Sequence, residues 1–302
     1  MLPAVEDWFA ARTWHRPQWT VSELVSAKAG RTVSVVLPAL DEETTVGAVV
    51  AALRPLVPTG LVDELVVIDS GSTDRTAAVA AAAGADVVHL HAVLPDLAPR
   101  PGKGEALWRS LAATGGDVLV FVDADLVDTD PGMVVALLGP ILTEHAVHLV
   151  KSCYRRPLGD AHDGGGRVTE LLARPLLAAL RPELSGIVQP LGGEYVLSRE
   201  FAESVPFAAG YGVEIGLLLD AHARYGLAGL AQVNLGVRRH RNRSLAQLGV
   251  MARQITATAF DRCGIPDPAV PLTQFVAVDG EWLPDTATAP LPDRTPMSST
   301  RE

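Results

Sequence analysis

The sequence predicts an α/β protein built on a doubly wound, mostly parallel sheet, on two observations. Short runs of valine, leucine and isoleucine alternate with alanine-rich segments of helical pattern through the first half of the 302-residue chain. Three of these runs end directly in acidic or hydroxyl-bearing residues. Alternating strands and helices of this length are typical of parallel strands joined by right-handed crossovers. Ligands bind at the carboxyl ends of such strands, so the polar strand ends mark where a site is expected.

The individual elements follow from the pattern of apolar residues. Strands are short buried runs of β-branched and aliphatic residues, and helices are longer segments with repeated alanine and leucine. Gly84, directly after an alanine-rich segment, is a natural end for a helix. Strands are expected over residues 33–38, 65–69, 86–90, 118–122 and 146–152, with one more after a turn over 189–195; helices end near Leu53 and Ala83 or cover 105–113, 167–180, 211–219 and 244–262.

The strand over residues 118–122 runs directly into two carboxylates, Asp123 and Asp125, separated by Ala124. Carboxylate oxygens are hard donors that suit Mg²⁺ or Mn²⁺. At the carboxyl end of a buried parallel strand, these residues are expected beside a ligand. An Asp-x-Asp pair could also merely cap the next helix, since aspartate is a favoured capping residue.

The other loops at this edge of the sheet complete the outline of a nucleotide site. The first strand ends in Pro38 and Ala39 and is followed by Glu42, while the second strand leads into Ser70. Lys103 lies between two glycines, which let the backbone approach a ligand closely. The carboxylates suit a uridine or ribose, and the lysine suits a phosphate. The sequence has neither the G-x-x-x-x-G-K-[ST] pattern nor a G-x-G-x-x-G after the first strand, so we expect a diphosphate held through a metal.

Three consecutive glycines at residues 164–166 precede Arg167 and Thr169 at the start of a predicted helix. The first turn of a helix has free backbone N–H groups, and an arginine and a threonine beside them make a ready anion site. A flexible hinge would explain the glycines but not the other two residues. We therefore expect a phosphate or carboxylate to bind here.

Composition limits the classes of partner. The formal net charge of −10 argues against nucleic acid and anionic membranes. Basic clusters at residues 155–156 and 238–243 still allow a small anionic substrate, although such clusters are often only solvated surface. No segment has the length and apolarity of a membrane span, and the N-terminus lacks the apolar core of a secretory signal. Cys153 and Cys263 give no disulfide framework, so a cytoplasmic protein is expected.

Several motifs together resemble a known family. Residues 35–43 (VVLPALDEE), residues 69–74 (DSGSTD) and the Asp123-Ala124-Asp125 triplet resemble the GT-A glycosyltransferases that use nucleotide-diphosphate sugars. Four later segments, at 101–108, 164–170, 210–216 and 237–243, are similar to the actinobacterial glucosyl-3-phosphoglycerate synthases. The likeness covers about residues 14–275, and the stretch between Arg156 and Gly164 is shorter than in the family.

The resemblance implies an activity. A retaining, metal-dependent GT-A enzyme would move glucose from UDP-glucose to the 2-hydroxyl of 3-phosphoglycerate, with Mg²⁺ or Mn²⁺ as cofactor. The product would be glucosyl-3-phosphoglycerate, and the reaction would be the first step of methylglucose lipopolysaccharide or glucosylglycerate synthesis. The resemblance also implies a homodimer. A double displacement would need a carboxylate close to the anomeric carbon, and none can be assigned, so front-face attack assisted by the departing phosphate is the expected route to retention.

The resemblance also implies roles for particular residues. On residue chemistry alone, a lone histidine such as His240 is more often structural than a ligand, and Glu214 could serve only as a partner for its helix dipole. The implied sets are Asp125, His240, Glu214 and Lys103 for catalysis, with Asp125 and His240 on the metal; Pro38, Ala39, Leu40, Glu42, Ser70, Lys103, Asp123, Ala124, Tyr211, Glu214 and Arg243 for the nucleotide sugar; and Gly166, Arg167, Thr169 and Asn242 for the acceptor.

Four parts are expected along the chain. Residues 1–30 hold Trp8, Trp14 and Trp19, and therefore should pack on a surface or on a partner subunit. Residues 31–152 should bind the nucleotide sugar, residues 153–275 should bind the acceptor and complete the metal site, and residues 276–302, rich in proline, aspartate and threonine, should form a disordered tail.

Three other functions remain open from the sequence. A polyprenol-phosphate glycosyltransferase shares the strand motifs but would normally bring membrane-associated segments. A different donor, such as GDP-mannose, would use the same strand ends. A non-catalytic nucleotide-sugar-binding protein could also use this fold, although it would not need the anion site at Arg167 or the basic cluster around His240.

Overall fold

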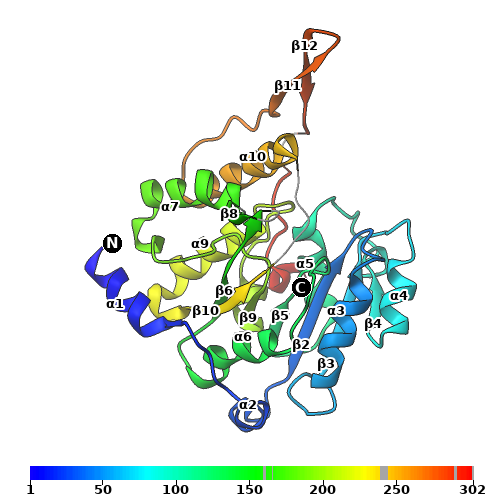
Figure 1. The fold of residues 1–302 in the computed structure, drawn as a ribbon, viewed down its shortest axis with the longest axis vertical. Coiled ribbons are helices and arrows are strands. Elements are labelled where there is room, and N and C mark those ends of the chain that lie inside the picture. Colours follow the sequence, from blue (N-terminus) through cyan, green and yellow to red (C-terminus); the bar gives the residue numbers. More distant parts are fainter. Residues whose placement is uncertain (159–160, 165, 239–243, 289–290, 301–302) are drawn as a thin grey trace.

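The computed structural model describes residues 1–158, 161–164, 166–238, 244–288 and 291–300. Its centre is an eight-stranded sheet with the order β1-β10-β6-β9-β5-β2-β3-β4 (Figure 1). The described pairs are parallel except those of β9, which runs antiparallel to both β5 and β6. The expected α/β class with a mostly parallel sheet is therefore confirmed.

The main elements agree with the predicted order. Strands are β1 Thr13–Trp14, β2 Val33–Ala39, β3 Glu64–Asp69, β4 Asp86–His89, β5 Val118–Phe121, β6 Leu149–Arg155, β7 Pro157–Leu158, β8 Ala161–Gly164, β9 Tyr195–Ser198, β10 Leu230–Val237, β11 Thr273–Val278 and β12 Glu281–Thr286. Helices are α1 Pro3–Arg12, α2 Val21–Lys28, α3 Val46–Leu53, α4 Thr76–Ala82, α5 Lys103–Ala113, α6 Gly132–Thr143, α7 Arg174–Leu180, α8 Arg199–Ser204, α9 Val213–Tyr225, α10 Leu245–Arg262 and α11 Met297–Thr300. A π-helical stretch, η3 Thr169–Ala173, precedes α7, and short 3₁₀ turns cover η1 Arg54–Leu56, η2 Leu90–Ala92, η4 Pro182–Leu184 and η5 Leu227–Gly229.

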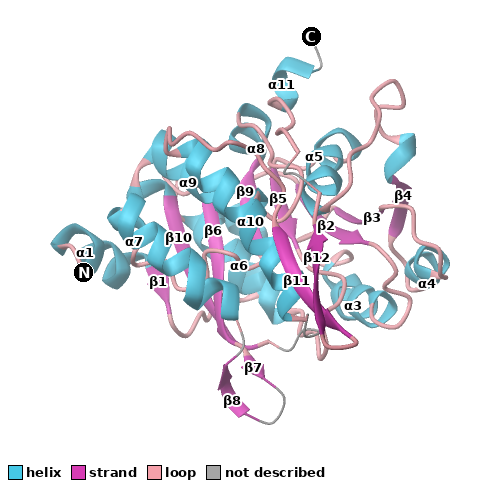
Figure 2. Cartoon of the chain, turned by 90° about the horizontal axis from the view of Figure 1, so that it is seen from above, coloured by secondary structure: helices cyan, strands magenta, loops and turns pink. Residues whose placement is uncertain are grey.

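Helices cover both faces of the sheet because successive strand residues point to opposite sides. In β2, Val35 and Leu37 belong to a core shared with α2, α3 and α6, whereas Val36 belongs to a second core shared with α5, α8 and α9. Figure 2 shows the strands side by side between these helices. Helix α6 was not predicted: its residues Met133 to Leu142 are all buried, so it shows no polar face.

The N-terminal segment packs on this chain's own sheet. Strand β1 pairs with β10 at one edge, and the indole nitrogen of Trp8 donates a hydrogen bond to the Leu230 carbonyl at 3.0 Å. The ring of Trp19 lies so close to Gly139 that a Cβ there would overlap it. The surface on which this tryptophan-bearing segment packs is therefore the body of the same chain.

Some boundaries differ from the prediction. Strand β6 extends to Arg155, three residues beyond the predicted end, because Cys153 and Tyr154 are also buried and Cys153 pairs with Asn234 of β10. The predicted division at residue 152 therefore falls within a strand, and the two parts predicted to bind the nucleotide sugar and the acceptor share one sheet. Helix α9 continues to Tyr225, beyond the predicted end at Leu219.

The prediction of a disordered tail over residues 276–302 is wrong for the described part of that segment. The hairpin β11–β12 projects beyond α10 (Figure 1), and residues 291–300 return to pack beside α5. Within that returning stretch Arg294 is 8% exposed and Met297 is fully buried. The polar composition of this segment predicted disorder, but a few buried side chains are enough to hold part of it against the body. Within the described ranges, the helices are too short or too polar to cross a membrane.

Candidate active site

A cleft of about 720 Å³ opens at the carboxyl ends of β2, β3 and β5. It brings together residues from loops that are far apart in the sequence. Every predicted site residue that the structure describes lines it: Pro38, Ala39, Leu40, Glu42, Ser70, Lys103, Asp123, Ala124, Asp125, Gly166, Arg167, Thr169, Tyr211 and Glu214. The predictions for His240, Asn242 and Arg243 fall outside the described residues.

Lys103 joins two walls of this cleft. Its ammonium nitrogen lies 2.5 Å from an oxygen of Asp123, at the end of β5, and 2.8 Å from an oxygen of Glu214, in the first turn of α9. Burial alone would lower the pKa of Lys103, but the charges of Asp123 and Glu214 outweigh it and raise that pKa well above its ordinary value. The lysine is therefore a fixed positive charge, in a position suited to an anionic group of a ligand.

The glycines beside Lys103 allow the backbone to come close to the 208–210 segment. A Cβ on Gly102 would lie 2.7 Å from the Ala209 carbonyl oxygen, and one on Gly104 would overlap the Ala208 carbonyl oxygen. Gly102 also has a φ of +111°, a conformation that side chains rarely adopt. This contact sets α5 against the segment that leads to Tyr211 and Glu214. The predicted role of these glycines was closeness to a ligand, and the structure adds closeness to this segment.

The two aspartates after β5 have different surroundings. Asp123 is paired with Lys103 and packs directly on Gly193, where a Cβ would overlap its carboxylate. Asp125 lines the cleft two residues further along. Its carboxylate oxygens fit a hard divalent cation, since Mg²⁺ usually takes one or two protein carboxylates and completes its shell with substrate phosphates and water. Among the described residues, no group of three or more His, Cys, Asp or Glu side chains could hold a metal by itself.

The loops after β2 and β3 are tied into one wall. Ser70 donates its backbone N–H to the Ala39 carbonyl at 2.9 Å, and the Asp41 N–H bonds the Ser72 hydroxyl at 3.0 Å. The Glu42 N–H bonds the Thr76 hydroxyl at 2.8 Å. These bonds hold the two strand ends in register, so the cleft wall is rigid where a flat base or a ribose could lie against it.

The predicted anion site begins at Gly166, whose φ of +71° turns the chain into the helix that starts at Arg167. Thr169 is buried, and Arg167 lines the cleft. Tyr154, in β6, and Arg156, directly after that strand, line the same cleft. In the sequence Arg156 stands out only as part of a basic cluster, and residue spacing does not show that it lies in the cleft.

Lys151 is a residue whose setting the sequence did not show. It lies in β6 below the cleft, 1% exposed, and donates a hydrogen bond to the Gly192 carbonyl at 2.6 Å. Its nitrogen lies 4.6 Å from the centre of the Tyr195 ring. Burial lowers the pKa of Lys151 to about 8, although the charge of Glu214 opposes that shift. A lysine inside an apolar strand is rare without a partner, and this was the available signal.

Comparisons with known proteins agree on one family. The model of the family described as "Glycosyl transferase family 2" matches residues 34–191. The chain is 60% identical to the glucosyl-3-phosphoglycerate synthase of Mycolicibacterium smegmatis, over 97% of this chain and 98% of the relative. It is 40% identical to the enzyme of the same name from Petrotoga mobilis, over 85% of this chain and 82% of the relative.

Solved structures agree as well. The crystal structure of glucosyl-3-phosphoglycerate synthase from Mycobacterium tuberculosis with Mn²⁺, UDP and glucosyl-3-phosphoglycerate is 58% identical, with a TM-score of 0.90 over 96% of this chain and 99% of that one. A complex of the same protein with Mn²⁺, UDP-glucose and phosphoglyceric acid gives 58% identity and a TM-score of 0.89, over 96% and 98% of the two chains. A third, with Mg²⁺ and UDP, gives 59% identity and a TM-score of 0.90, over 96% and 99%.

Proposed function

Since the chain belongs to glycosyl transferase family 2, we propose that it transfers glucose from UDP-glucose to the 2-hydroxyl of 3-phosphoglycerate. The product is glucosyl-3-phosphoglycerate, and we assign the enzyme to the first step of methylglucose lipopolysaccharide or glucosylglycerate synthesis. One observation carries the proposal. The Mycobacterium tuberculosis synthase whose structure matches 96% of this chain, with a TM-score of 0.89, holds Mn²⁺, UDP-glucose and phosphoglyceric acid together.

The donor occupies the side of the cleft formed by the ends of β2, β3 and β5. Pro38, Ala39, Leu40, Glu42 and Ser70 surround the nucleoside, and Asp123, Ala124, Tyr211 and Glu214 surround the diphosphate and the sugar. Arg243, from outside the described residues, belongs to the same set. The rigid wall between the two strand ends supports this side for the flat base.

Lys103 contributes a positive charge beside the diphosphate. Because Asp123 and Glu214 hold its pKa high, it is charged throughout the physiological range. As the bond between glucose and UDP breaks, negative charge grows on the departing UDP. A fixed ammonium beside it stabilises the transition state more than the ground state. This difference is what makes Lys103 catalytic in the proposal, and not merely a binding residue.

Mg²⁺ or Mn²⁺ is the cofactor of the proposed reaction. Asp125 is its described protein ligand, and His240 is the second ligand that the resemblance implies. Bound there, the ion supplies Lewis-acid stabilisation of the leaving diphosphate. The single carboxylate is sufficient for the described part of the site because phosphate oxygens of the donor complete the shell.

The acceptor lies beside Gly166, Arg167 and Thr169, with Asn242 as a further contact outside the described residues. Arg167 pairs with an acid group of 3-phosphoglycerate, and the helix N-terminus adds backbone N–H donors. Arg156 and Tyr154 line the same side. Much of the rate then comes from holding the 2-hydroxyl near the anomeric carbon.

Retention of configuration is part of the proposal. Asp123 and Glu214, two of the carboxylates in the cleft, share the charge of Lys103, which weakens each as a nucleophile. Front-face attack by the acceptor, assisted by the departing phosphate, fits this arrangement better than a double displacement does. The anomeric coupling constant of the product, measured by NMR, distinguishes an α-linked from an inverted β-linked glucoside.

We also assign the enzyme to the cytoplasm and to a homodimer. Cys153 and Cys263 are both free thiols, as is usual in a reducing compartment.

The hairpin β11–β12 exposes Phe275 and Trp282 by 62% and 72%, and an isolated two-stranded hairpin is marginally stable in water unless something covers it. A mass of twice 31.8 kDa in light scattering, reduced by Trp282→Ser, is expected for a dimer.

A panel of substrates tests the function. UDP-glucose, GDP-glucose and GDP-mannose are each incubated with 3-phosphoglycerate and Mn²⁺, and the released nucleotide is measured. Fast release from UDP-glucose, with a glucosylated acceptor detected by mass, is expected. If nucleotide release does not depend on 3-phosphoglycerate but requires polyprenol phosphate, the protein is a polyprenol-phosphate glycosyltransferase. Tight UDP-glucose binding without release would point to a non-catalytic binding protein.

A further inference from the structure

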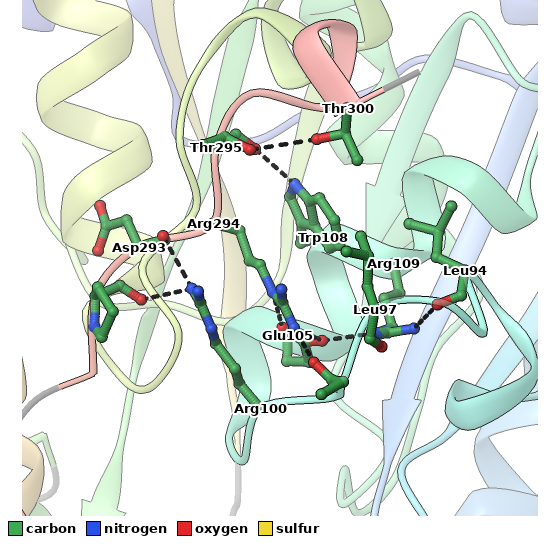
Figure 3. A network of polar contacts seen from close by, with 12 residues as sticks. Leu94, Leu97, Arg100, Glu105, Trp108, Arg109, Asp293, Arg294, Thr295 and Thr300 are labelled. Atoms are coloured by element: carbon green, nitrogen blue, oxygen red, sulfur yellow. Dashed lines mark hydrogen bonds and ion pairs between the residues drawn. The ribbon is translucent and has the colours of Figure 1, made fainter. Parts of the chain in front are cut away.

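Residues 291–297, which begin the last described segment of the chain, are attached to the body by buried polar contacts. Arg294 exchanges two backbone hydrogen bonds with Phe207, at 3.0 and 2.8 Å. The indole nitrogen of Trp108, on α5, donates to the Thr295 carbonyl at 2.9 Å. Met297 is fully buried in the second core. We call residues 291–297 the C-terminal clasp, and Figure 3 shows its contacts with α5.

The centre of these contacts is a buried carboxylate, that of Glu105. Arg294 donates to its two oxygens at 2.7 and 2.8 Å, and Arg109 donates to one of them at 2.7 Å. Burial alone would raise the pKa of Glu105, but these hydrogen bonds and the charge of Arg294 hold the pKa below its ordinary value. Removing one partner of a buried ion pair is costly because it leaves a charge with too little compensation.

The same arginines hold the loop that precedes Lys103. Arg109 donates to the Leu97 carbonyl at 2.6 Å, and Arg294 donates to the Ala98 carbonyl at 2.6 Å. Arg100 reaches the other way and donates to the clasp carbonyls of Pro292 and Asp293 at 2.8 and 2.9 Å (Figure 3). The loop over 94–102 is therefore bound on both sides before the chain enters α5.

This loop ends in the cleft. Arg100 and the 101–103 stretch line it, and Lys103 supplies the charge beside Asp123. The clasp also bonds Phe207, in the segment that leads to Tyr211 and the first turn of α9. It thus connects the two chain segments that Lys103 bridges, although residues 291–297 are not among those that line the cleft.

We propose that the C-terminal clasp is a structural part of the donor site, with Arg294 as a positioning residue that fixes the 94–102 loop and, through it, Lys103. The inference rests on the proposed function only for the choice of nucleotide. A fixed Lys103 meets the diphosphate without having to be ordered on binding, which would cost part of the affinity. The clasp contacts named above lie at α5, the 94–102 loop and Phe207, and none of them involves the 166–169 segment on the acceptor side of the cleft.

The test compares two arginines that bind opposite ends of α5. Arg294→Met removes the contacts at its first turn. Arg199→Met is the matched control, because Arg199 donates to the Leu111 carbonyl at 2.9 Å and to the Thr114 hydroxyl at 3.0 Å, at the last turn of the same helix. For each full-length protein we measure the Kd of UDP with Mn²⁺, hydrogen exchange in residues 94–104, melting temperature, and KM for both substrates.

Arg294→Met should raise the Kd of UDP and the KM for UDP-glucose by about tenfold, a loss of about 1.4 kcal/mol. It should speed hydrogen exchange in residues 94–104 and leave the KM for the acceptor nearly unchanged. Arg199→Met should lower the melting temperature with little change in UDP binding. The conservative Arg294→Lys, which keeps the charge but loses the paired geometry, should restore part of the UDP affinity.

Other results overturn the proposal. If Arg294→Met binds UDP as the parent does, the clasp has no positioning role. If both variants weaken UDP in step with lost stability, the role is merely structural. Should Arg294→Met fail to fold, Arg294→Lys must show the weakened UDP binding and the faster exchange, or the proposal is rejected. If the parent binds UDP with Mn²⁺ but transfers no glucose, the proposed function is wrong. The UDP affinity and the hydrogen exchange of the variants would still test whether the clasp positions the loop.

Discussion

The ammonium nitrogen of Lys103 lies 2.5 Å from Asp123 and, on its other side, 2.8 Å from Glu214. The first carboxylate follows a central strand and the second opens a helix on the far side of the cleft. One lysine therefore offsets part of the negative charge of two carboxylates that would otherwise repel a nucleotide diphosphate more strongly. The first prediction follows from this bridge.

Lys103→Met should reduce kcat by about a hundredfold or more, since it removes charge stabilisation worth roughly 3 kcal/mol. The two carboxylates then face the cleft without a cation, and UDP should bind more weakly as well. Initial rates of UDP release and the Kd of UDP with Mn²⁺ measure both effects.

Lys28→Met is the matched control for this lysine. Lys28 is also largely buried and lies 2.5 Å from a carboxylate oxygen of Asp63, but it belongs to α2 and does not line the cleft. The Lys28→Met variant should be less stable than the parent and should keep the parent's kcat. If the two variants lose activity equally per folded molecule, Lys103 acts only through the fold.

The second prediction is metal dependence. EDTA should abolish transfer, and excess Mn²⁺ or Mg²⁺ should restore it. Asp125→Ala should abolish transfer at saturating metal with the fold intact, as judged by circular dichroism, because it removes the described carboxylate of the proposed metal site. Asp128→Asn, three residues on, exposed and outside the cleft lining, should behave as the parent does. Full activity in EDTA contradicts the metal assignment.

His240→Ala tests the other implied ligand. It should weaken the binding of UDP more in the presence of Mn²⁺ than in its absence, with little change in melting temperature. A variant that is unstable but keeps normal activity per folded molecule would make His240 a structural residue.

The strand ends were predictable from the sequence because their chemistry is local. Asp123 and Asp125 follow directly on a buried strand, and the carboxyl ends of parallel strands must meet at one edge. The pairing of Lys103 with Glu214 had no such signal, since two distant segments meet there through glycine contacts. The predicted strand for β6 stops beside Lys151, because a lysine normally leaves the core. The clasp was missed because composition does not show that Glu105 is buried and takes a second arginine from the end of the chain.

Lys151 gives a pH prediction. Its pKa is about 8 in the folded protein and near its ordinary value, about 10.5, when unfolded. Between these values the unfolded chain binds more protons, so this residue makes the free energy of unfolding rise with pH, by at most about 1.4 kcal/mol per unit. Urea unfolding at several pH values from 7 to 10 should show the parent gaining stability relative to Lys151→Met. A pH-independent difference between the two proteins would mean that Lys151 is not deprotonated in this range.

The last prediction concerns the acceptor. Arg167→Ala should raise the KM for the acceptor, 3-phosphoglycerate, about ten- to a hundredfold, because a hydrogen bond to a charged group is worth roughly 1.5–3 kcal/mol. The Kd of UDP should stay nearly unchanged. Thr169→Ala should act in the same direction but more weakly, since it removes a neutral donor. Arg174→Ala is the control, because Arg174 lies further along the same helical stretch, pairs with Glu170 and does not line the cleft.

Glycerate, which lacks the phosphate, identifies the group that Arg167 holds. It should be a poor acceptor for the parent, and it should lose less than 3-phosphoglycerate does on Arg167→Ala if the arginine binds the phosphate. Equal losses for both acceptors would place Arg167 on the carboxylate instead. No loss for either would mean that the short loop after Arg156 has moved the acceptor away from this helix. The substrate assignment would then depend on the similarity to known synthases, without support from the cleft.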